Sequence, residues 1–132
     1  MSTADLKYGL DFENMLYGKV KELFGDDTLQ TSGSHPYDYY NSNTFIELKS
    51  RRCKHNRYPT TMIGENKLKF ASKNPDKKFI FLFRFEDGLY QHIFNPEKEY
   101  NIKIGGRQDR GRPEFKKYCY IPITELTLLL PS

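Results

Sequence analysis

The sequence predicts an α/β (α+β) fold in which helices flank a mixed central sheet. Three observations support this prediction. Apolar residues recur at helical spacing over residues 5–24, and two runs rich in Tyr, Phe and Ile predict a hairpin over residues 37–50. Residues 77–85 are almost continuously apolar, which is typical of a central strand covered on both faces. A chain of 132 residues can bury a sizeable core, so we expect one domain over residues 1–132.

The first helix is predicted over residues 5–24, with Gly25 and Asp26 after it as a stop signal. Its apolar stripe has one exception, because Glu13 lies where an apolar side chain is expected. A buried carboxylate is costly unless it is paired or bound to a metal ion. On the pattern of the helix alone, a glutamate at the edge of the stripe, with its carboxylate in water, is an equally good explanation. A short strand over residues 28–32 follows.

The hairpin brings candidate functional side chains together. Residues 41–44 are the turn-rich cluster, and a two-residue loop at residues 42–43 would pair position 38 with position 47. Asp38 and Glu47 would then lie opposite each other, with Cβ atoms about 5 Å apart, and Lys49 would project to the same face. Two carboxylates at this distance repel each other unless a cation lies between them, and oxygen ligands suit Mg²⁺ or Mn²⁺. A Glu-x-Lys sequence is also common on a solvated strand, so the functional interpretation depends on this register.

The rest of the chain alternates polar and apolar segments. We expect a basic loop, a second helix that ends before a proline, a central strand and further short strands. In chain order these are the loop 51–60, the helix 62–73, the strand 77–85, the turn 86–88, the strand 89–94, and strands near 99–104 and 118–123. The apolar tail 126–130 is expected to pack on the core.

Positive charge is concentrated in two segments. Lys and Arg number 21 against 17 Asp and Glu, which gives a net charge of +4. Residues 49–57 contain five basic residues and no acid, and residues 103–117 are basic and rich in glycine. Either segment alone would be an ordinary solvated loop. Two such segments, one starting inside the candidate site, favour binding to a nucleic-acid backbone.

The cysteines and the apolar segments exclude several classes of protein. Cys53 and Cys119 have no zinc-finger spacing, and two thiols without a signal peptide predict an intracellular protein of the cytoplasm or nucleus. The longest apolar run, residues 79–83, is too short to cross a membrane. We therefore expect no membrane partner.

The order of elements and the acidic residues resemble the PD-(D/E)XK nuclease superfamily, which includes restriction endonucleases, Holliday junction resolvases, and recombination and repair nucleases. The restriction-endonuclease-like αβββαβ core is similar to the order predicted over residues 5–85, with extra strands after it. Asp38 matches the acid of the second core strand, and Glu47-Leu48-Lys49 matches the Glu-x-Lys of the third. Glu13 matches a first-helix glutamate of resolvase-like members, which favours a functional role for it. The motif departs at Tyr37, which separates the proline from the aspartate.

The resemblance implies a metal-dependent deoxyribonuclease. Its Mg²⁺ or Mn²⁺ would be held by Asp38, Glu47 and the backbone carbonyl of Leu48, with Glu13 bound directly or through water. Lys49 would orient the attacking water, and the products would carry a 5′-phosphate and a 3′-hydroxyl. Lys67, preferred to Lys69, would be a further cation from the second helix, although a solvated lysine is the more common role on such a helix. The residues expected to contact nucleic acid are Ser32, Ser34, Arg51, Arg52, Lys67, Arg107, Arg110 and Arg112.

The expected activity has alternatives. A chain this short leaves no room for a separate sequence-reading domain, so we expect structure-selective cleavage of branched or junction DNA, or weakly specific cleavage. A homodimer would allow both strands to be cut. The main alternative is a catalytically inactive nucleic-acid-binding module of the same fold, which would not need all four residues Glu13, Asp38, Glu47 and Lys49. A protein-interaction subunit is a third interpretation, and it leaves the basic segments without a role.

Overall fold

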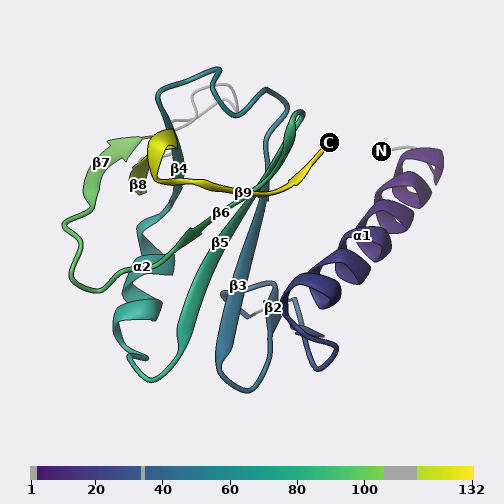
Figure 1. Ribbon diagram of the computed structural model, residues 1–132, viewed down its shortest axis with the longest axis horizontal. Helices are drawn as coiled ribbons and strands as arrows, with labels where there is room; N and C mark the ends of the chain where they lie inside the picture. The colour runs from purple at the N-terminus through teal and green to yellow at the C-terminus, as the bar shows by residue number, and fades with distance from the viewer. Residues whose placement is uncertain (1–2, 34, 106–115) are drawn as a thin grey trace.

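The structure, a computed structural model, describes residues 3–33, 35–105 and 116–132, and the side chains of the first helix from Asn14 onward. Figure 1 shows the arrangement of the helices and strands. The elements are α1 (Thr3–Phe24), β1 (Leu29–Gln30), β2 (Tyr39–Tyr40), β3 (Thr44–Ser50), β4 (Thr60–Gly64), α2 (Glu65–Ser72), β5 (Lys78–Phe85), β6 (Gly88–Ile93), β7 (Asn101–Gly105), β8 (Lys116–Pro122), the short 3₁₀ helix η1 (Ile123–Glu125) and β9 (Thr127–Pro131).

The strands form a mixed sheet, as predicted, and a second sheet that was not predicted. Among the described residues, six strands pair in the order β1-β2-β3-β5-β6-β9, and three pair in the order β4-β8-β7. β3 and β5 are parallel, and α2 lies between them in the sequence, whereas the other pairs of the larger sheet are antiparallel. The two helices lie on opposite sides of the larger sheet (Figure 1). The predicted α/β fold with a restriction-endonuclease-like core is confirmed.

The central strand β5 explains why the helices flank the sheet. Its side chains alternate between two apolar clusters, so neither face tolerates polar residues. Ile80 and Leu82 pack with Val20 of α1, whereas Phe79, Phe81 and Phe83 pack with Leu68 and Ala71 of α2 and with Cys119 of β8. The predicted burial of this strand on both faces is confirmed.

The segment before α2 differs from the sequence prediction. Residues 60–64, predicted as the end of a loop and the start of a helix, form β4, and α2 begins at Glu65. Thr61 and Ile63 are buried and alternate with exposed or half-buried neighbours, which is the period of a strand. Their partner is β8, more than fifty residues further along the chain, so local periodicity did not reveal the pairing. The C-terminal tail packs on the core as expected, but as the strand β9 paired with β6.

Two exclusions made from the sequence can be compared with the structure. Cys53 and Cys119 are both free thiols. No helix in the described part of the chain is long and apolar enough to cross a membrane.

Candidate active site

The β2–β3 hairpin has the predicted register. Tyr39 pairs with Ile46 and Tyr40 with Phe45. The backbone N–H of Asn41 donates to the carbonyl of Thr44 over 2.9 Å, which closes the two-residue loop. The register is confirmed as far as Tyr39 and Ile46, where the ladder ends. Asp38 lies just before β2, and its carboxylate is close enough to Glu47 to repel it.

Asp38 is fixed by the strand beside it. Its backbone N–H donates to the carbonyl of Ile46 over 3.0 Å, and its carbonyl accepts from the backbone N–H of Thr31 over 3.0 Å. Its carboxylate oxygen Oδ2 accepts from the backbone N–H of Leu48 over 2.7 Å. The exposed Asp38 carboxylate is therefore held against the Glu47-Leu48-Lys49 segment of β3.

Glu47 is a buried carboxylate with incomplete hydrogen bonding. Its exposed fraction is 4%, and within the described part of the chain its oxygen Oε2 has no hydrogen-bond partner. Two ammonium groups lie nearby, Lys67 Nζ at 3.1 Å from Oε2 and Lys49 Nζ at 3.6 Å from Oε1. The contact of Lys67 with Oε2 is an ion pair, and it lowers the pKa of Glu47. Burial, and then repulsion from Asp38, raise the pKa of Glu47, and the two lysines only partly offset them.

Lys67 reaches Glu47 from the first turn of α2, and a buried tyrosine fixes its position. The Lys67 ammonium also donates to the carbonyl of Pro36 and lies 5.6 Å from the centre of the Tyr37 ring. The Tyr37 hydroxyl donates to the carbonyl of Lys67 over 2.7 Å. Lys69, two residues on, pairs instead with Glu65 on its own helix at 3.3 Å and is 66% exposed. The structure therefore brings Lys67, and not Lys69, to the carboxylates.

Tyr37 shows why an extra residue fits between the proline and the aspartate. It is 1% exposed and packs against Phe45, Phe70 and Phe79. Burial, and then the charge of Glu47, raise the pKa of its hydroxyl, which donates to a backbone carbonyl. The sequence analysis did not identify this link to α2. The only sequence signal was the departure from the family motif.

The other predicted site residues fall into two groups. Arg51 donates from Nη2 to the carbonyl of Met62 over 2.7 Å, and Arg52 and Ser32 are exposed. The Glu13 side chain and all of Ser34, Arg107, Arg110 and Arg112 lie outside the described residues. Helix α1, which carries Glu13, packs Val20 against Ile46 and thus on the face of β3 opposite Glu47. The predicted contribution of Glu13 stays a prediction.

The candidate metal ligands that the structure brings together are few and are all oxygen atoms. Asp38 and Glu47 face each other, and no described group of three or more His, Cys, Asp or Glu side chains forms a metal site on its own. Oxygen-only donors are typical of sites for hard divalent cations and atypical of zinc sites.

Comparison with known proteins identifies the family. The family model described as "Phage putative PDDEXK endonuclease" matches residues 4–129, which span both sheets and both helices except the first residue of α1 and the last two of β9. No curated protein and no solved structure matches the chain. The match covers almost the whole chain and agrees with the fold. The chain therefore belongs to this family, and with it to the PD-(D/E)XK nuclease superfamily.

Proposed function

We propose that this protein is a metal-dependent endonuclease that hydrolyses phosphodiester bonds of DNA. The observation that carries the proposal is the Glu47 carboxylate. It is buried beside the Asp38 carboxylate, and the ammonium groups of Lys67 and Lys49 only partly offset its burial and this repulsion. Burying a charge in this way costs stability, and a bound cation would offset the cost.

The residues fit Mg²⁺ or Mn²⁺. Both ions prefer carboxylate and carbonyl oxygens, and Asp38 and Glu47 supply the carboxylates. Leu48 is the candidate for a carbonyl ligand. Its N–H points toward Asp38, and in an extended strand the C=O of a residue points to the same side as its N–H. The family resemblance implies Glu13 as a further ligand, directly or through water, but α1 packs on the face of β3 opposite Glu47, so this ligand rests on the resemblance alone. A divalent cation in such a site lowers the pKa of bound water and stabilises negative charge on the phosphate.

The two lysines have different surroundings, so we assign them different roles. The Lys49 side chain is 37% exposed, and its ammonium lies beside Glu47, where it can hold an attacking water. The Lys67 side chain is 15% exposed and is held by the Pro36 carbonyl and Glu47. It offsets the charge of Glu47 before substrate arrives and offsets charge on the scissile phosphate afterwards. The products would carry a 5′-phosphate and a 3′-hydroxyl, as the family resemblance implies.

The proposed substrate is DNA without a long recognition sequence. Arg51 and Arg52 continue from the site strand and add positive charge beside it. We propose that the chain acts as one nuclease domain that selects DNA structure, such as branches or junctions, or cuts with weak specificity. A homodimer would place two sites on opposite strands. An inactive binding module receives no support from a specific observation, because binding alone gives no reason to bury Glu47 beside Asp38.

The test is cleavage of DNA by the purified chain. Linear duplex, single-stranded and four-way-junction DNA are incubated with Mg²⁺ or Mn²⁺ and the wild type, Glu47→Ala, or the control Glu65→Ala, whose carboxylate pairs with Lys69 away from the site. We expect cleavage by the wild type and by Glu65→Ala, and none by Glu47→Ala or in EDTA. Cleavage that persists both in EDTA and in Glu47→Ala would overturn the proposed mechanism.

A further inference from the structure

A cavity of about 430 Å³ opens where the site strand ends. β3 continues past Ser50, because the backbone N–H of Arg51 donates to the carbonyl of Arg84 over 2.8 Å. Arg51 lines the cavity and lies four residues beyond Glu47 on the same face of the strand. Four residues of extended strand span about 13 Å, which is the approximate distance from Glu47 to the cavity. A DNA strand advances about 3.4 Å per nucleotide along a duplex, so the cavity lies within about four nucleotide steps of the candidate site.

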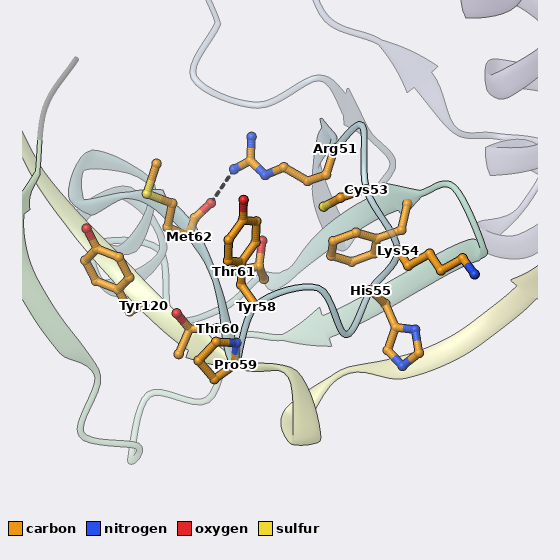
Figure 2. A pocket seen from close by; sticks show the side chains of 11 residues that line it. Arg51, Cys53, Lys54, His55, Tyr58, Pro59, Thr60, Thr61, Met62 and Tyr120 are labelled. Carbon is orange, nitrogen blue, oxygen red and sulfur yellow. Dashed lines mark hydrogen bonds between the residues drawn. The ribbon is translucent and has the colours of Figure 1, made fainter. Parts of the chain in front are cut away.

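The lining of the cavity is aromatic and apolar, and its rim is cationic. Residues from both sheets and from the loop between β3 and β4 contribute to it. The apolar part consists of Tyr58, Pro59, Met62, Phe85 and Tyr120. Figure 2 shows Arg51 with its hydrogen bond to Met62 at one rim, Tyr120 on one side, and Lys54 and His55 on the other. Tyr58 is 59% exposed, so a ring suited to stacking is available to a ligand.

The loop that forms the cavity is held in place. The backbone N–H of His55 donates to Asp87 Oδ1 over 2.8 Å, and the ring of His55 bonds the other Asp87 oxygen and stacks on Tyr90 at 4.6 Å. The backbone N–H of Glu86 donates to the carbonyl of Cys53 over 2.9 Å. These contacts also engage both carboxylate oxygens of Asp87. The cavity is therefore formed before any ligand binds, which reduces the ordering cost of binding.

We propose that this cavity binds an unpaired base of the DNA substrate, and thus that the preferred substrate carries unpaired nucleotides near the cleavage point. An aromatic floor suits the face of a base, and a cationic rim suits the phosphates on either side of it. Arg57 lies 5.6 Å from the centre of the Tyr58 ring, where its guanidinium can bind such a phosphate. A paired base cannot enter, because its face is covered by its neighbours in the stack.

The inference rests on the proposed function, but its test is independent of cleavage. Binding of fluorescent oligonucleotides is measured in EDTA, where no cleavage is expected. The ligands are a single-stranded oligonucleotide, the same length with abasic positions, and the matching duplex. We expect Tyr58→Ala to weaken binding of the single strand about 5- to 150-fold, and Tyr58→Phe, which keeps the ring, to weaken it less than about twofold. The affinities for the duplex and for the abasic oligonucleotide should change little, because contacts with phosphates account for their binding.

Each other outcome overturns the cavity proposal. Equal binding of abasic and base-bearing strands would assign the affinity to phosphates alone. If Tyr58→Ala lowers the affinity for the single strand and for the duplex equally, Tyr58 makes a general surface contact. If an equal concentration of free dTMP displaces the oligonucleotide, the cavity binds a mononucleotide. If the cavity proposal fails while Glu47-dependent cleavage is observed, the proposed function stands. Thermal unfolding of each variant verifies the fold, and we expect no loss because Tyr58 is largely exposed.

Discussion

Replacing Lys67 with methionine tests the electrostatic arrangement of the site before any substrate or metal is added. The substitution keeps most of the side-chain length and removes the ammonium that lies 3.1 Å from Glu47 Oε2. Two unit charges at this distance attract each other by about 5 kcal/mol at an effective dielectric constant of about 20, and by about 1 kcal/mol in bulk water. Breaking a fully buried ion pair costs about 3–5 kcal/mol. Lys67 is 15% exposed and Lys49 remains 3.6 Å from Glu47, so we expect a smaller loss of about 2–3 kcal/mol.

The assay is urea unfolding in EDTA, arranged as a double-mutant cycle with Glu47→Gln. We expect Lys67→Met to lower the unfolding midpoint by roughly 1–2 M urea in the wild-type background. In the Glu47→Gln background the cost should fall below about 1 kcal/mol, because no unpaired carboxylate is left behind. Lys69→Met is the control, since Lys69 is exposed and its helical pair with Glu65 is worth about 0.5 kcal/mol or less. A Lys67→Met cost no larger than that of Lys69→Met, or one unchanged by Glu47→Gln, would refute this reasoning.

Three further predictions follow from other parts of the fold. Tyr37→Phe removes the 2.7 Å hydrogen bond to the Lys67 carbonyl. The free energy of unfolding in urea should fall by about 1–2 kcal/mol, and cleavage should slow. Unchanged stability would mean that the bond is dispensable. Burial lowers the folded-state pKa of His92, so the unfolded chain takes up a proton first as pH falls. Melting temperature should then decrease as pH falls below about 6.5, less so in His92→Gln, and an equal decrease in both would contradict the assignment. Gly88 has φ +152°, and an added Cβ would lie 2.8 Å from the carbonyl oxygen of Leu130. Gly88→Ala should therefore lower the free energy of unfolding by about 1–3 kcal/mol in the same urea assay. A neutral result would contradict the strain argument.

The sequence allowed the hairpin and its register to be predicted because their causes are local. One turn-rich tetrad lies between two strand-forming runs, and the two-residue period of a strand then determines which side chains face each other. This is sufficient to bring Asp38, just before β2, close to Glu47. The burial of β5 was equally predictable, because a strand covered on both faces has no polar side to break its apolar run.

Other features depend on contacts between distant segments. A lysine on a short polar helix is usually solvated, and Lys67 is an exception only because Tyr37 and the Pro36 carbonyl lie beside it. β4 was taken for part of a loop and a helix, because its partner β8 is remote in the sequence. The cavity around Tyr58 was also missed, since it is formed by both sheets and a loop that reads only as basic and polar. In each case the residues that contact the segment lie about thirty or more positions away in the sequence. Local periodicity describes only neighbouring residues and does not reveal such contacts.

The central claim is that Asp38 and Glu47 together hold a divalent cation. Titration of the protein with Mn²⁺, followed by the electron paramagnetic resonance signal of the free ion, measures this without DNA. We predict that the wild type and Glu65→Gln bind Mn²⁺ with equal affinity, and that Asp38→Asn and Glu47→Gln each weaken binding by about tenfold or more. Mn²⁺ binding as tight in Asp38→Asn and Glu47→Gln as in the wild type would contradict the claim.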